Sequence, residues 1–165
     1  METARLLALI AAMVTMGNMA GVFGLYSHTV MPGLRRTDDR TFVGAFQALD
    51  RAIINPWFML GGFLGALVFT GAAAGLLLGP GGAALTWTLT AFALYLVVFV
   101  ITVAVNVPMN DTIKAAGEPD GIADLAGVRA RFDEARWSRW NLVRTVLTTL
   151  AVICLAMALM EHGRG

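Results

Sequence analysis

Residues 57–79, WFMLGGFLGALVFTGAAAGLLLG, and residues 83–105, AALTWTLTAFALYLVVFVITVAV, are two apolar runs without a charged side chain. Each run is longer than the ~20 residues that a helix needs to cross the hydrocarbon core of a bilayer. Helices are predicted because lipid offers no partner for unpaired backbone groups, and because the runs are too long for barrel strands. The segment Gly79-Pro80-Gly81-Gly82 is a tight uncharged turn, so the two helices are expected to form a hairpin.

Two further apolar runs, residues 4–30 and residues 140–160, also reach spanning length. The first begins beside Arg5 like a signal peptide, but it continues for about 40 Å at roughly 1.5 Å per residue, well beyond a signal core. We therefore expect a retained first span, with a cleaved signal peptide as the alternative. The predicted fold is all-α, an integral membrane four-helix bundle that forms a single transmembrane domain over residues 1–165.

The composition agrees with a protein that faces lipid. Hydrophobic residues make up 58% of the chain and charged residues 14%, against roughly 25% charged in soluble domains. The formal net charge of +1 leaves no basic footprint, so a nucleic-acid partner is not expected. The single cysteine, Cys154, lies in an apolar run and gives no information on the redox compartment.

Two polar connections separate the hairpin from the outer spans. The first, residues 31–56, is expected to hold an amphipathic helix capped by Asp38 or Asp39. Its predicted apolar stripe consists of Phe42, Phe46, Leu49 and Ile53. In the second connection a helix is expected to start near Asp124 and to continue directly into the fourth span.

Basic residues are distributed unevenly between the two ends of the predicted bundle. The two polar connections contain most of the arginines, whereas Arg5 and Arg164 are the basic residues of the opposite end. The positive-inside rule therefore places both connections in the cytoplasm and both termini outside it. The expected location is a bacterial inner membrane, with a multi-pass topology.

Polar side chains gather at the cytoplasmic ends of all four predicted spans. They are His28, Asn55, Asn106, Asn110, Asn141 and Arg144. Polar groups at membrane depth are costly and usually face a bundle interior or a wet cavity. Residues 137, 140, 141 and 144 are spaced as one helical stripe, so Trp137, Trp140, Asn141 and Arg144 are expected to share a face.

Structural roles remain open for the same residues. The tryptophans fit an interfacial belt, and Arg144 fits a side chain that snorkels to lipid headgroups. Asn106 and Asn110 flank Pro108, which is expected to break the third helix, so both fit caps of freed backbone groups. His28 on its own fits an interfacial histidine.

The sequence contains no metal-binding or haem-binding pattern. His28 and His162 lie at opposite ends of the predicted bundle and cannot share a ligand, and no CxxC, HxxxH or HExxH spacing occurs. No cofactor is identifiable, although a weakly bound metal held by His28 with Asp50 is left open.

The arrangement of these residues resembles the anthrone oxygenase-like family of small four-helix membrane proteins. The segments that carry the resemblance are Val30-Met31-Pro32-x-Leu34, Gln47, Asn55-Pro56-x-Phe58, Asn106-Val107-Pro108-x-Asn110 and Trp137-x-x-Trp140-Asn141-x-Val143-Arg144-Thr145. Asp50 departs from the pattern, which has an asparagine there. The resemblance implies an oxidoreductase of monooxygenase type. It would oxidise an anthrone to an anthraquinone with molecular oxygen as co-substrate, without a conventional flavin or haem.

Such chemistry needs a flat apolar slot, a base and donors for a developing oxyanion. Under the resemblance His28 is the expected base, because histidine titrates near neutral pH, and Asp50 is the second candidate. The expected oxyanion donors are Arg144, Asn141, Asn106 and Asn110. The expected substrate-binding residues are Trp137, Trp140, Phe58, Gln47 and Asn55.

A second class of function fits the same sequence. The chain would then be a non-catalytic membrane protein that binds a lipid or a hydrophobic metabolite, or that supports a partner complex. In either case the expected partners are membrane lipids and a hydrophobic small molecule, and a homo-oligomer is left open.

Overall fold

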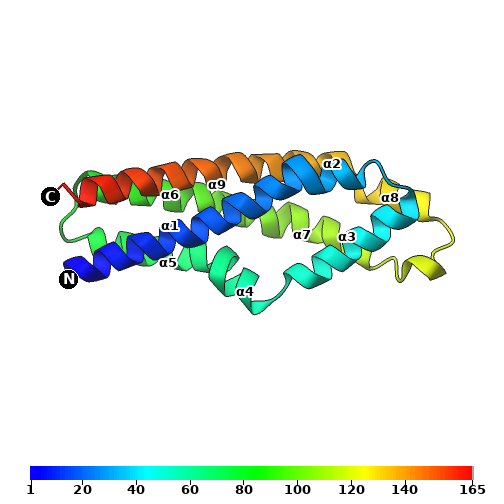
Figure 1. Ribbon diagram of the computed structural model, residues 1–165, viewed down its shortest axis with the longest axis horizontal. Coiled ribbons are helices and arrows are strands. Elements are labelled where there is room, and N and C mark those ends of the chain that lie inside the picture. Colours follow the sequence, from blue (N-terminus) through cyan, green and yellow to red (C-terminus); the bar gives the residue numbers. More distant parts are fainter. Residues whose placement is uncertain (165) are drawn as a thin grey trace.

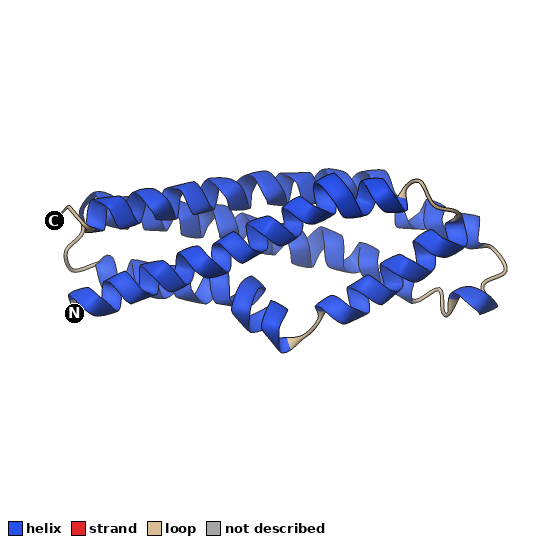
Figure 2. Cartoon of the chain, viewed as in Figure 1, coloured by secondary structure: helices blue, strands red, loops and turns tan. Residues whose placement is uncertain are grey.

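The computed structural model describes residues 1–164 and is entirely helical in its regular elements, with no strand in that range (Figures 1 and 2). The predicted all-α membrane bundle is therefore confirmed. In chain order the elements are α1 Glu2–Leu25, η1 Tyr26–Val30, α2 Met31–Leu34, α3 Asp39–Ile53, α4 Pro56–Phe58, η2 Met59–Phe63, α5 Leu64–Leu77, α6 Gly82–Ile101, η3 Thr102–Asn106, α7 Val107–Lys114, η4 Pro119–Gly121, α8 Leu125–Phe132 and α9 Glu134–His162.

Four helices in residues 1–164 are long and apolar enough to cross a membrane, which makes the chain a membrane protein. They cover Glu2–Leu34, Pro56–Leu77, Gly82–Lys114 and Leu125–His162. Three of them extend further toward the polar connections than the predicted spans. The prediction that the third helix breaks at Pro108 is wrong, because this helix continues through the proline to Lys114.

Short π-helical segments allow helices one and three to continue through a proline. The segments η1 and η3 end just before Met31-Pro32 and Val107-Pro108, and in each the next residue donates its N–H to the carbonyl five residues earlier. A proline lacks the N–H that an α-helix requires and clashes with the preceding turn, and the wider π turn accommodates it. A third segment, η2, contains Gly61-Gly62 instead. Such segments are frequent at functional sites.

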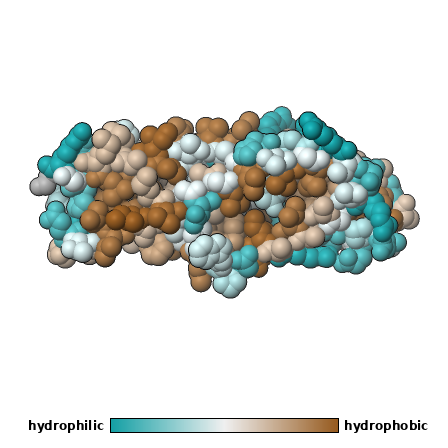
Figure 3. Space-filling view, viewed as in Figure 1, coloured by the Kyte–Doolittle hydropathy of each residue, from teal (hydrophilic) through white to brown (hydrophobic). Residues whose placement is uncertain are grey.

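Two apolar cores follow one another along the bundle. The first joins the four spans and includes Leu9, Met16, Ala91 and Leu155. The second lies at the end that carries α3 and α8, and includes Met31, Phe42, Phe46, Ile113 and Phe132. In the view of Figure 3, hydrophilic residues gather at the two ends of the molecule and hydrophobic surface predominates between them, as expected for a bundle that spans a bilayer.

The polar connections fold back onto the bundle. Asp38 caps α3, since Oδ1 accepts the backbone N–H of Thr41 at 2.8 Å, and this hydrogen bond lowers the pKa of Asp38. The buried face of α3 contains Phe42 and Phe46 as predicted, but Leu49 is 39% exposed and Asp50 lies on the buried face instead.

The segment Leu125–His162, counted above as one membrane helix, is interrupted at one residue, so the expected continuous helix is divided into α8 and α9. Asp133 has a φ of 52° and separates α8 from α9, while its side chain accepts the N–H of Arg136. Arg129 of α8 ties this corner to the start of α3, because its guanidinium contacts Asp39 and Glu134 at 3.1 Å each. The second core is thereby fixed to the membrane bundle.

The uneven charge distribution yields a prediction about orientation. A reporter fused to the C-terminus, after Gly165, which lies outside the described residues, is expected to be active outside the cytoplasm. A reporter inserted within residues 117–121 is expected to be active in the cytoplasm. Alkaline phosphatase and green fluorescent protein fusions distinguish the two compartments. A cytoplasmic signal from the C-terminal fusion would contradict the orientation.

Candidate functional site

A cavity of about 250 Å³ lies between the two apolar cores. Its lining comes from all four membrane helices and from α3, which closes it on the polar side. All three π-helical segments contribute a lining residue, namely Tyr26, Met59 with Phe63, and Thr102. The widened turns therefore lie at the level of the cavity, where they change the direction in which the following side chains point.

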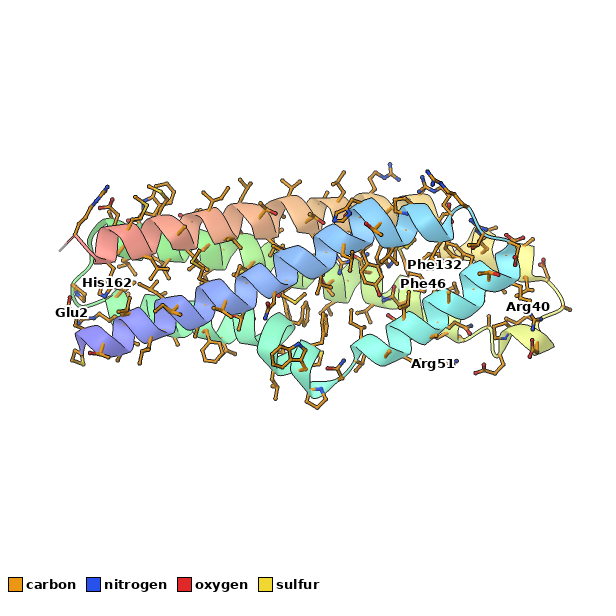
Figure 4. All side chains as sticks on the ribbon, in the orientation of Figure 1. Glu2, Arg40, Phe46, Arg51, Phe132 and His162 are labelled. Carbon is orange, nitrogen blue, oxygen red and sulfur yellow. The ribbon has the colours of Figure 1, made fainter. Side chains whose placement is uncertain are left out.

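Six of the eighteen residues that line the cavity are aromatic. Phe23, Tyr26, Phe46, Phe58, Phe63 and Trp137 all line it. Tyr26 and Trp137 have ring centroids 5.8 Å apart, and Phe46 meets Trp137 edge-on at 5.6 Å. Phe46 also contacts Phe132 inside the bundle, whereas Arg40 and Arg51 point away from it (Figure 4). Such a wall suits a flat aromatic molecule.

Arg144 lies at the inner end of the cavity. It is 5% exposed, and about 25 Å of helix, at roughly 1.5 Å per residue, separate it from Glu161 at the opposite end of the bundle. Its guanidinium donates to Asn141 Oδ1 at 2.8 Å and to Thr102 Oγ1 at 3.1 Å, and lies 4.4 Å from the centre of the Phe23 ring. Nε has no partner. No carboxylate among residues 1–164 forms an ion pair with Arg144.

Asn141 fixes the position of this guanidinium. Its side-chain nitrogen donates to the Phe23 carbonyl at 2.9 Å and to Ser27 Oγ at 2.7 Å, so its oxygen is turned toward Arg144. Ser27 in turn lies 3.0 Å from the Thr145 hydroxyl. These hydrogen bonds connect α1 and η1 to α9 and hold a cation in an apolar wall.

Asp50 lies toward the outer end of the cavity and is 8% exposed. Its Oδ1 accepts the Asn110 side-chain N–H at 2.6 Å, and its Oδ2 lies 2.7 Å from Lys114 Nζ. Asn110 Oδ1 accepts the indole N–H of Trp137 at 2.7 Å. The two hydrogen bonds that connect Trp137, Asn110 and Asp50 therefore orient the carboxylate and the indole ring together.

The cavity contains some of the expected site residues but not all of them. Asp50, Phe58, Asn110, Trp137, Asn141 and Arg144 line it. Trp140 is not in the lining and does not belong to the buried stripe of α9, which includes Trp137, Asn141, Arg144 and Thr148. Gln47 is buried, but it donates to the carbonyls of Ile113 and Gly117 and so ties α3 to the end of α7.

Asn55 and Asn106 lie outside the lining as well. Asn55 caps α4, with its oxygen 3.0 Å from the Phe58 nitrogen. Asn106 is 1% exposed, and neither atom of its amide has a hydrogen-bond partner. It therefore does not act as the helix cap that the flanking proline suggested.

His28 is not placed in the slot where it was expected. It belongs to η1, is exposed, and its Nδ1 lies 2.6 Å from the Thr29 hydroxyl. It is absent from the cavity lining, so the structure brings Asp50, and not His28, together with Arg144. Within the described part of the chain no cluster of His, Cys, Asp and Glu side chains has the arrangement of a metal site.

Several lining residues were not anticipated from the sequence. Lys114 and Thr102 hold the two charged ends of the cavity in place, and Phe23, Phe46 and Phe63 complete its aromatic wall. The apolar stripe of α3 gave a signal for Phe46. No sequence pattern identified Thr102 as a site residue, because it lies in an apolar run that is typical of a lipid-facing helix.

The fold and site thus define a four-helix membrane protein with an aromatic cavity that contains a buried arginine. A family model described as Anthrone oxygenase matches residues 55–154, which is more than half of the chain. The chain belongs to this family, and the resemblance seen in the sequence is confirmed. A search of the curated proteins and a search of the solved structures each found no match. Arg144 and Asn110 lie within the matched residues, whereas His28 and Asp50 precede them.

Proposed function

We propose that this protein is a membrane-embedded oxygenase that oxidises an anthrone-type or other hydrophobic aromatic substrate with molecular oxygen. The family supports an oxygenase-like role in general. The observation that carries the specific proposal is Arg144, a buried guanidinium without an acidic partner that lines an aromatic cavity. A buried charge without a counter-ion is costly, and a substrate that becomes an anion would supply the missing charge.

The chemistry requires an acidic C–H bond. The central methylene of an anthrone is acidic because its conjugate base is delocalised over three rings and one oxygen. Loss of a proton gives an electron-rich anthrolate, which reacts with oxygen to a hydroperoxide. The hydroperoxide then loses water and leaves a carbonyl. One oxygen atom ends in the quinone and the other in water together with the two methylene hydrogens, so the substrate itself supplies all the electrons.

Arg144 and Asn141 are assigned to the oxyanion. Preorganised donors at the place where charge develops are usually the largest single contribution to such a reaction. The guanidinium is held by Asn141 and Thr102, so it does not have to reorganise when the substrate ionises. Its Nε is buried and also has no hydrogen-bond partner.

Asp50 is assigned as the base in place of His28. Its carboxylate lines the cavity at the end opposite to the expected oxyanion site, and Asn110 orients it. Asp50 Oδ2 lies 2.7 Å from Lys114 Nζ, and the proton taken up by Asp50 can leave through the half-exposed Lys114 side of the site.

The proposal is tested by purified protein in nanodiscs with anthrone as substrate. Oxygen uptake and quinone absorbance are recorded beside protein-free nanodiscs, because anthrones autoxidise. The expected result is a rate that exceeds this background, is proportional to protein concentration and saturates with substrate. If the rate never exceeds the background although anthrone binds, the chain is a non-catalytic binder of hydrophobic metabolites.

A further inference from the structure

The cavity reaches the surface where its lining residues are exposed. Among its lining residues, all within residues 1–164, the exposed ones are Ile54, Val107 and Asp111. Ile54 lies at the corner between α3 and α4, and the other two lie on α7. The mouth is therefore bounded by this corner on one side and by α7 on the other.

The mouth exists because helices two and three separate at this level. Further in, α5 packs along α6, and Phe63 stacks on Phe99 with ring centroids 5.3 Å apart, which closes the cavity toward the membrane centre. The short helix α4, which lies between α3 and η2 in the chain, projects from the side of the bundle (Figure 1). On the polar side α3 packs back onto α7. The opening is thus a side window in the bundle wall.

Both edges of this window continue into exposed apolar surface. Ile54 is 62% exposed and Trp57, on the same edge, is 77% exposed. On the other edge the exposed side chains of Val100, Val103 and Val107 follow one helical stripe. Asp111, one turn further toward the polar end, is the only charged residue in the described mouth, and it lies 3.1 Å from Lys114.

The position of the window along the third membrane helix fits the interfacial layer of a bilayer. About 38 Å of helix, at roughly 1.5 Å per residue, separate Val107 from the start of α6 at Gly82. That length exceeds the ~30 Å hydrocarbon core but not the ~40–45 Å of the whole bilayer. An exposed tryptophan such as Trp57 is typical of this layer.

We propose that the window is a lateral portal through which an uncharged, flat amphiphile enters the cavity from the bilayer leaflet rather than from water. This inference goes beyond the proposed reaction, because it applies to any ligand of the cavity. The apolar edges at Ile54 and Val107 admit a molecule dissolved in lipid. Asp111 and Lys114 at the outer corner solvate its polar edge. Ionisation then takes place inside, beside Arg144.

The test uses cysteine labelling and needs no catalytic activity. In a Cys154→Ala background, Met59→Cys places a thiol on the cavity wall. Its labelling by pyrene maleimide dissolved in the nanodisc lipid is compared with labelling by a charged, water-soluble methanethiosulfonate. Asp120→Cys, on an exposed loop, reports reactivity from water. Leu142→Cys, which is 54% exposed on α9 and outside the lining, reports reactivity from lipid.

The portal predicts that Met59→Cys reacts with the lipid-dissolved reagent as Leu142→Cys does, and at least about tenfold more slowly with the charged reagent than Asp120→Cys does. Narrowing the window with Ile54→Trp and Val107→Trp should slow pyrene labelling of Met59→Cys at least about tenfold. Leu142→Trp should leave it unchanged. The portal would be overturned if the charged reagent labelled Met59→Cys about as fast as it labels Asp120→Cys. It would also be overturned if Ile54→Trp and Val107→Trp left pyrene labelling of Met59→Cys unchanged in a protein that remains folded in detergent.

Discussion

Replacing Arg144 by methionine is expected to lower the rate of anthrone oxidation by ~10²–10³, the usual loss when one oxyanion donor is removed. The side chain is 5% exposed and lines the aromatic cavity, so water cannot easily take over its stabilisation of the oxyanion. The rate is measured as oxygen uptake above autoxidation in nanodiscs. Arg144→Lys keeps the positive charge but lacks the planar guanidinium, so its rate should lie between those of the wild type and Arg144→Met.

Arg164→Met is the matched control, because Arg164 is exposed at the far end of the bundle and pairs with Glu161. It should retain the wild-type rate. Arg144→Met should also lower the unfolding temperature more than Arg164→Met does. It leaves Asn141 Oδ1 and Thr102 Oγ1 unpaired, at roughly 1–3 kcal/mol for each buried acceptor. A wild-type rate in folded Arg144→Met would remove this residue from the mechanism.

Asp50→Asn is expected to lower the same rate by ~10²–10⁴, the range for loss of a general base. Asparagine has nearly the same shape and keeps an oxygen for the Asn110 N–H, so packing of α3 should survive. The variant loses the group that accepts the proton and the charge that pairs with Lys114. The change should appear mainly in kcat, since Asp50 is not part of the aromatic wall.

Two controls separate the base from general effects of charge. Asp120→Asn removes a carboxylate from the exposed loop, where it pairs with Arg40, and should be without effect. His28→Gln should also leave the rate unchanged, because His28 is exposed and outside the cavity. If His28→Gln abolishes oxidation while Asp50→Asn does not, the base is the histidine and the cavity assignment is wrong.

Much of the fold follows from the sequence because hydropathy alone determines it. Residues 57–79 and 83–105 have no alternative to crossing a membrane, and the Gly-Pro-Gly-Gly turn leaves no alternative to a hairpin. The ends of the helices were harder to predict from the sequence. Pro108 was expected to break the third helix, whereas a π-helical turn carries the chain through it, and another carries the first helix through Pro32.

The site was predictable where one helix determines it and not where distant segments meet. The spacing of Trp137, Asn141 and Arg144 places them on one face of α9, as expected, but the same stripe includes Thr148 and excludes Trp140. The pairing of Asp50 with Asn110 and Lys114 depends on how α3 folds back onto α7, which no local pattern specifies. His28 was expected in the site because histidine titrates near neutral pH, which does not specify the helix face, and the structure places it on an exposed face of η1.

The most direct measurement of the central claim, that the cavity stabilises an aromatic oxyanion, uses a hydroxyanthraquinone as a stable stand-in for the ionised substrate. Its colour reports ionisation, so its apparent pKa can be titrated in nanodiscs that contain the wild type or Arg144→Met. We expect the pKa of the bound phenol to be lower in the wild type by at least about one unit, roughly 1.4 kcal/mol. Equal pKa values of the bound phenol in the two proteins would contradict the account.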